Sequence, residues 1–228
     1  MKLEDKANLK TFAFLCFASV LKGKFTIKNL KLDEEALNFI HILQSLGLKI
    51  NLEQNKIEIH SLGALHLFEP KEVIDVKGSH LTAFALCGLF APYDYTVFLT
   101  DSTKKLEGFS FSPLILGLWE AGARFFYSHN FCLPFSIKGT SNFLPMTHSI
   151  LSNNPALELA FLNMGLQGVG KTHIISPFNH GFGEILTALK AGSTIKILED
   201  GALDIAVSLL PQNTEEKIEI NLWRTKQF

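Results

Sequence analysis

The residues with the most recognisable spacing for chemistry run from Gly165 to Thr172, where GLQGVGKT fits the letters of a phosphate-binding P-loop. Such a loop needs a strand before it and a helix after it, because the first N–H groups of the helix then face the phosphates. The flanking residues favour the reverse order. Residues 156–164 are rich in Leu and Ala, as a helix is, and the β-branched residues 173–176 end at Pro177. A nucleotide site built on Lys171 is therefore the weakest of our hypotheses.

Charged and metal-binding side chains point to few other sites. The chain has 21 basic and 22 acidic residues, which gives no field that would attract nucleic acid or an anionic membrane. Only Arg124 and Arg224 are arginines, although arginine is the side chain best suited to bidentate binding of phosphate or carboxylate. The eight histidines show neither HxxxH nor HExxH spacing. We therefore expect no metal site and no cofactor.

The cysteines and the apolar runs indicate the cellular compartment of the protein. The three cysteines are an odd number without CxxC spacing and lie in apolar surroundings, which predicts buried thiols in a reducing compartment: Cys16, Cys87 and Cys132. The apolar runs 11–21 and 81–91 are too short to span a bilayer. Glu4 and Asp5 are unlike the positively charged start of a secretory signal peptide, and no small-x-small cleavage site follows the apolar run. We expect a cytoplasmic protein with no membrane partner.

The elements that must position these residues recur in one order. The first round has an apolar helix over 11–23, a strand over 24–30, a helix opened by the acidic residues 33–35 and ended by Gly47, and strands over 48–52 and 56–60. The second has a helix over 81–91, a strand over 95–100, a helix over 112–122, and strands over 123–127 and 135–139.

The third round completes the pattern. It has a helix over 155–165, a strand over 172–176, a helix over 182–192, a strand over 194–198, and a final strand in either 202–210 or 217–223. The helix-stopping glycines Gly47, Gly122 and Gly192 lie 75 and 70 residues apart. We predict an α/β (α+β) fold of three αβαββ units, at about 5–65, 66–140 and 141–210, with 211–228 as a last strand or tail. A single domain over 1–228 would pack these units around a pseudo-threefold axis, apolar helices inside and sheets outside.

Four segments carry a resemblance to a known family. EDKANLKTF lies where the family has G-D-K-S-x-S-H-R, and DVKGSHLTAF lies where it has N-[SA]-G-T-[TA]-x-R. TDSTKKLEGFSFSP and NNPALELAF correspond to its R-x-R-P-M and S-S-Q segments. In the order and spacing of these segments, the chain resembles the enolpyruvyl transferases, most closely the branch that acts on shikimate 3-phosphate. The resemblance implies a domain of this fold, of which the family has two.

The resemblance also implies ligands and residues. Family members hold phosphoenolpyruvate and shikimate 3-phosphate between two domains and transfer the enolpyruvyl group through a tetrahedral intermediate. Lys6 matches a lysine that contacts both substrates. Ser79, Thr82 and, with a one-residue shift, Ser176 match further substrate-binding positions. These four are our candidate substrate-binding residues, and we assign no catalytic residue.

Most other matched positions differ from the family. The Ser-His-Arg of the first motif is Leu9, Lys10 and Thr11, and the closing Arg of the second is Phe84. The arginine-rich loop falls on residues 107–111, which contain no Arg. The S-S-Q segment is Asn153, Asn154 and Pro155. Because such chemistry needs concentrated positive charge, we expect a truncated transferase-like protein that is inactive alone.

Two alternatives stay open besides the nucleotide hypothesis. The chain is either a non-catalytic interaction module on the same scaffold or half of a split enzyme whose second domain is a separate chain. An apolar patch where a second domain would pack, predicted from Phe109, Phe111, Phe125 and Phe126, would favour a partner chain or self-association.

Overall fold

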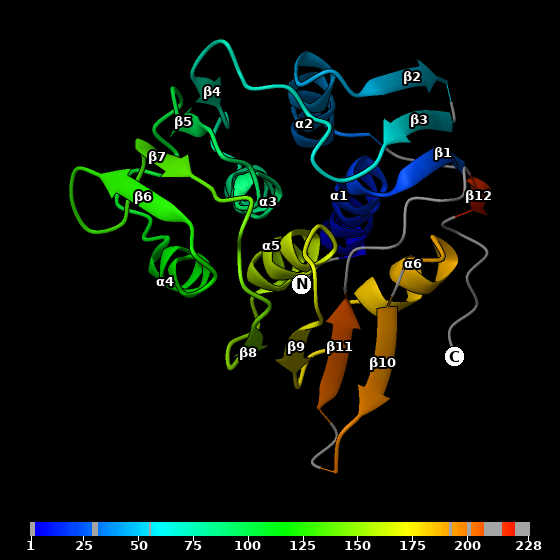
Figure 1. Cartoon of the computed structure of the whole chain (residues 1–228). Coiled ribbons are helices and arrows are strands. Elements are labelled where there is room, and N and C mark those ends of the chain that lie inside the picture. The colour runs from blue at the N-terminus through cyan, green and yellow to red at the C-terminus, as the bar shows by residue number, and fades with distance from the viewer. Residues whose placement is uncertain are drawn as a thin grey trace.

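Three four-stranded sheets surround three inner helices in the computed structural model, which describes residues 3–28, 32–54, 56–191, 193–199, 202–207 and 216–221. The inner helices are α1 (Leu3–Val20), α3 (His80–Phe90) and α5 (Pro155–Gly165). The outer helices are α2 (Glu34–Ser45), α4 (Ser112–Glu120) and α6 (Phe182–Ala188). Figure 1 shows α1, α3 and α5 at the centre, with one sheet and one outer helix beyond each. No helix in the described ranges is long and apolar enough to cross a membrane.

The three sheets share one strand order. The first is β12 (Glu216–Asn221), β1 (Lys22–Lys28), β3 (Lys56–Leu62) and β2 (Lys49–Glu53). The second is β4 (Ile74–Asp75), β5 (Thr96–Thr100), β7 (Phe135–Lys138) and β6 (Arg124–Tyr127). The third is β8 (Thr147–Ser149), β9 (Thr172–Ser176), β11 (Leu203–Val207) and β10 (Ser193–Ile197). In each order the first pair is parallel and the next two pairs are antiparallel.

This topology corrects the predicted unit. Each sheet has a first strand that the αβαββ pattern lacks, and in the second and third sheets this strand, β4 or β8, has only two or three residues. In the first sheet β12 takes this position by pairing parallel to β1. The two alternatives for the final strand are therefore both strands, since β11 lies in 202–210 and β12 lies in 217–223 apart from its first residue.

Most element bounds agree with the sequence pattern, and α1 differs most. It begins at Leu3 rather than at residue 11, because the intervening Glu, Lys and Ala are good helix formers. It ends at Val20, so that Lys22 and Gly23 belong to β1. Gly47 adopts a positive φ of 91° just after α2, as a helix-stopping glycine does. Gly192 lies outside the described residues.

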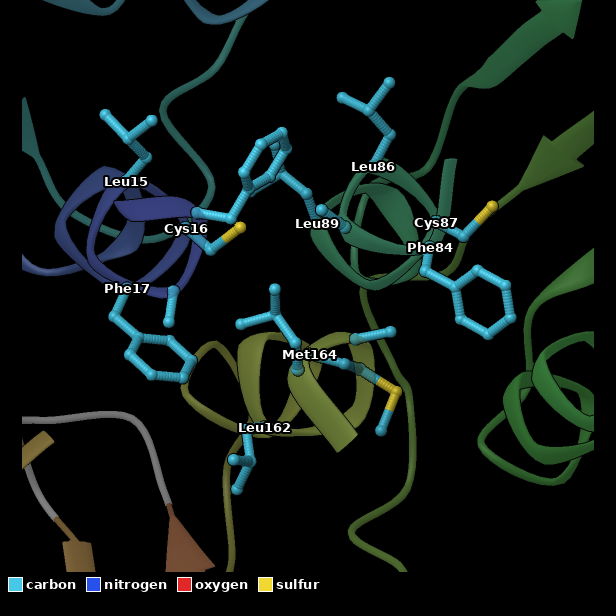
Figure 2. Close-up of a cluster of buried hydrophobic side chains, with 14 of the residues drawn as sticks. Leu15, Cys16, Phe17, Phe84, Leu86, Cys87, Leu89, Leu162 and Met164 are labelled. Atoms are coloured by element: carbon cyan, nitrogen blue, oxygen red, sulfur yellow. The ribbon is translucent and has the colours of Figure 1, made fainter. Parts of the chain in front are cut away.

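The three inner helices are buried all round over most of their described length. Residues 12–18 of α1 are completely inaccessible, and α3 and α5 are covered in the same way. Figure 2 shows side chains from all three helices filling the space between them. Each phenylalanine buried there contributes about 1.5–3 kcal/mol. The three cysteines are free and buried as predicted, and burial raises the pKa of the Cys16 and Cys87 thiols.

Gly88 sets the distance between two of these helices. A Cβ placed on it would lie 2.2 Å from the carbonyl oxygen of Ala160, so the backbones of α3 and α5 touch. The backbone of Ala160 cannot rotate away to make room for a Cβ, whereas the tip of a flexible side chain could. Only glycine therefore fits this crossing without moving a helix.

Two carboxylates organise the loops beside the start of α3. Asp75 accepts N–H groups of Lys77 and Ser102 at 3.0 and 3.1 Å. Asp101 accepts the N–H groups of Thr103 and Leu106 at 3.0 and 2.9 Å, together with the Thr103 hydroxyl. Slight burial would by itself raise the pKa of each carboxyl, but the hydrogen bonds outweigh it and lower both pKa values.

Gly88→Ala should destabilise the protein by about 1–3 kcal/mol, although Gly→Ala inside a helix normally stabilises. Gly183→Ala in α6 is the matched control, because its Cβ would meet only the tip of Ile195, a half-exposed side chain that can move. Denaturant unfolding of both variants measures the difference. A Gly88→Ala protein as stable as the unmodified protein would contradict the close crossing.

Asp101→Asn should lower the melting temperature near pH 7, because the amide cannot serve all of the donors around this carboxylate. The carboxyl's pKa is lowered in the folded state, so its stabilisation is present above the usual value of 3.8 and disappears as the pH falls through the lowered value. The gap between variant and unmodified protein should close in acid. Asp94→Asn, at an exposed position, is the control, and a gap independent of pH would contradict the account.

Candidate functional site

The start of α3 holds the candidate Ser79, whose side chain is engaged within the chain. Ser79 is the N-cap residue of α3, and its Oγ accepts the N–H of Thr82 at 2.8 Å. The same hydroxyl donates to Oε1 of Glu35 in the first turn of α2. The other oxygen of Glu35 accepts the Asn8 side-chain amide of α1 at 2.8 Å. A carboxylate of the chain thus sits against the donors where the resemblance places an anionic substrate.

Thr82 lies one turn into α3 and does not reach the surface. Its side chain is fully buried, and its Oγ1 has no hydrogen-bond partner among the described residues. The preceding His80 is exposed, with its ring 5.9 Å from that of Phe109. The rings of Phe109 and Phe111 pack 4.9 Å apart and both contact Phe84. An aromatic cluster therefore occupies the region of residues 107–111, where the resemblance places the family's arginine-rich loop.

Ser176 at the end of β9 is closed into its own turn. Its Oγ donates to the carbonyl of Phe178 at 3.3 Å and accepts the N–H of the same residue at 3.2 Å. Its exposed fraction is 1%. The Ser176 hydroxyl hydrogen is already donated to a backbone carbonyl, and the side chain is too buried to contact a ligand.

The polar groups at the start of α5 also form hydrogen bonds within the chain. Asn154 caps the helix by accepting the N–H of Leu157 at 3.1 Å. The oxygen of Asn153 lies 2.8 Å from Nε2 of His180, and Nδ1 of that ring lies 2.7 Å from the Glu158 carboxylate. Sequence reasoning missed this cluster. The available signal was Glu158, a lone carboxylate inside an apolar helix, which requires a buried partner.

Of the cationic candidates that the structure describes, Lys105 lies beside the start of α3, because its Cδ is 2.6 Å from the position of a Cβ on Gly78, the residue before Ser79. Lys6 belongs to α1, and its side chain lies outside the described atoms. Arg124 on β6 donates to the carbonyls of Gly122 and Ala123, so its guanidinium is held on backbone. Lys104 and Lys105 are exposed on the loop after β5. Arg224 lies outside the described residues.

The predicted apolar patch is only half correct. Phe111 and Phe125 are buried, because they face the core from the start of α4 and from β6. Phe109 and Phe126 are 38% and 65% exposed, on different elements. The sequence pattern missed Phe98, which is 56% exposed and flanks Ser136 together with Phe126 on the second sheet.

The segment from Gly165 to Thr172 lacks the order that a P-loop requires. Helix α5 ends at Gly165 and strand β9 begins at Thr172, so the helix precedes the loop and the strand follows it. Lys171 is exposed on this turn. The loop is not followed by a helix whose N–H groups could bind phosphates. The structure therefore does not support a nucleotide site there. Within the described ranges, no three His, Cys, Asp or Glu side chains gather into a group that could hold a metal ion.

Taken together, the described candidates form hydrogen bonds but leave few groups for a ligand. Ser79 and Ser176 donate internally, Thr82 is buried, and Asn153 and Asn154 serve His180 and the α5 backbone. The sequence located these positions because they match family motifs. It could not show their partners, which lie on other elements.

Comparisons of fold identify similar structures. The EPSP synthase from Acinetobacter baumannii superposes with a TM-score of 0.79 at 17% identity, over 94% of this chain and 48% of that one. The enolpyruvyl transferase NikO from Streptomyces tendae gives a TM-score of 0.67 at 14% identity, over 95% of this chain and 49% of that one. At these identities the likeness shows the fold, which confirms the predicted fold class.

Comparisons of sequence identify the family. The 3-phosphoshikimate 1-carboxyvinyltransferase of Caldicellulosiruptor saccharolyticus is 24% identical over 203 residues, covering 88% of this chain and 46% of the relative. That of Bacillus cytotoxicus is 34% identical over 91 residues, covering 39% and 22%. The chain spans about half the length of the relatives that it matches over most of its own length. The family model described as EPSP synthase (3-phosphoshikimate 1-carboxyvinyltransferase) matches residues 10–149, more than half of the chain, and the chain therefore belongs to the EPSP synthase family.

Proposed function

We propose that this chain is a non-catalytic member of the EPSP synthase family. By itself it neither binds phosphoenolpyruvate and shikimate 3-phosphate tightly nor transfers the enolpyruvyl group between them. The observation that carries the proposal is the contact between Ser79 and Glu35 at the start of α3. A carboxylate already accepts the serine hydroxyl there, and its negative charge opposes a second anion.

The missing cations strengthen this argument. Both substrates are anions, and transfer between them needs concentrated positive charge together with a group that moves protons. Each lost arginine–anion hydrogen bond forfeits about 1.5–3 kcal/mol. Three such losses weaken binding by about 10³- to 10⁶-fold, since 1.4 kcal/mol is a factor of ten. The one arginine described, Arg124, is held by backbone carbonyls at the edge of the second sheet.

The coverage of the relatives favours a second candidate function. The chain matches 46–48% of their length, as expected of one domain of a two-domain transferase. In that case the other domain, on further sequence or on a separate chain, would supply the remaining ligands. Lys6 would then be the residue of this chain with the best match to a substrate contact.

Purified protein should release no inorganic phosphate from millimolar phosphoenolpyruvate and shikimate 3-phosphate, and calorimetry should detect no binding of either. The physical reason is the loss of guanidinium ligands combined with the Glu35 carboxylate beside Ser79. The Acinetobacter baumannii EPSP synthase serves as the positive control.

The same assay separates the alternatives. Turnover by this chain alone, abolished in Lys6→Ala, would contradict the proposal. A neighbouring reading frame that encodes a second three-unit domain, and whose product restores turnover on mixing, would replace it with the two-domain candidate.

Glu35→Gln should destabilise the protein by about 1.5–3 kcal/mol more than Glu34→Gln, because it replaces a charge-assisted contact with a neutral one. Both residues lie in the first turn of α2, so loss of the favourable helix-dipole interaction is common to both variants. Only Glu35 joins Asn8 to Ser79. Equal unfolding midpoints for the two variants would mean that Glu35 does not hold these donors.

A further inference from the structure

A buried contact between a histidine and a carboxylate connects the start of α5 to the loop before α6. The Glu158 side chain is 1% exposed and that of His180 is 4% exposed. Nδ1 of His180 lies 2.7 Å from a carboxylate oxygen of Glu158, and Nε2 lies 2.8 Å from Oδ1 of Asn153. Both ring nitrogens therefore face oxygen atoms.

This geometry favours a ring that carries a proton on both nitrogens. A neutral imidazole has one N–H donor and one bare acceptor nitrogen, whereas an imidazolium donates from both nitrogens. An ionised carboxylate and an amide oxygen only accept. A neutral ring would need the Asn153 amide to turn so that its nitrogen donated, or Glu158 to carry the proton.

The surrounding groups are few, and the Glu158 contact is the closest. On α1 the Lys10 side chain passes beside Gly181, where its Cε lies 3.7 Å from the position of a Cβ on that glycine. A carboxylate oxygen of Glu184 on α6 lies 3.7 Å from the same position. The rings of Phe178 and Phe182 lie 6.1 and 5.8 Å from the imidazole and help to exclude water. One cation, Lys10, and one further carboxylate, Glu184, therefore lie near the loop that carries His180.

We propose that His180 is held as an imidazolium that neutralises the buried Glu158 and binds the loop over residues 177–181 to the start of α5. Removing the proton would leave one of the two oxygens without a donor. This inference stands on the contacts of His180 alone and is independent of the proposed lack of catalysis.

The direct test is nitrogen NMR of the unmodified protein labelled on its histidines. At neutral pH both ring nitrogens of His180 should give signals of protonated nitrogen, and the ring of His173 serves as an internal comparison. His173 also pairs with a carboxylate, Asp204, but through Nδ1 only and at a more exposed site. A single protonated nitrogen on His180 at neutral pH would overturn the proposal.

Variants test the connection itself. His180→Gln should speed hydrogen exchange of the amides at 181 and 182 by about tenfold or more, because it leaves Glu158 buried without a cation. His173→Gln, the matched control, should change exchange at those amides less than twofold. The double variant Glu158→Gln/His180→Gln removes both charges and should be more stable than His180→Gln alone. Equal exchange in His180→Gln and His173→Gln would contradict the proposal, and the NMR result decides it if a variant fails to fold.

Discussion

The structure depends on the mutual burial of α1, α3 and α5. Residues 12–18 of α1 and most of α3 and α5 are buried all round, so no single unit can cover its own helix, and the three units must share one interior. The contact between Gly88 and Ala160 shows how closely two of them approach. Because the helices are fixed together, their N-terminal ends are fixed as well. The candidate residue Ser79 lies at the start of α3, and Asn153 and Asn154, which replace a family motif, lie at the start of α5.

Helix ends need acceptors for their free N–H groups, and in this chain its own side chains supply them. Ser79 and Asn154 cap α3 and α5, and the carboxylates of Glu35 and Glu158 then satisfy the capping serine and the neighbouring histidine. Asp75 and Asp101 do the same for the adjacent loops. Polar groups at the starts of α3 and α5 and in the adjacent loops are thus satisfied by carboxylates of the chain itself.

The sequence predicted the framework because its signals are local. Helix α5 and strand β9 match the predicted bounds, since Asn154 and Pro155 begin the helix and β-branched residues form the strand. Strands β4 and β8 were not predicted, because two or three residues carry no periodicity. Strand β12 was predicted as one of two alternatives, but its pairing with β1 was not, because the two strands are nearly two hundred residues apart. The site partners escaped for the same reason: Glu35 and Ser79 are 44 positions apart, and Glu158 and His180 are 22 apart.

The most direct measurement of the central claim is a crystal structure of the protein soaked in phosphoenolpyruvate and shikimate 3-phosphate. The account predicts that Ser79 still donates to Glu35, with neither substrate ordered at the start of α3. A phosphate or carboxylate ordered against Ser79, with Glu35 displaced, would contradict it.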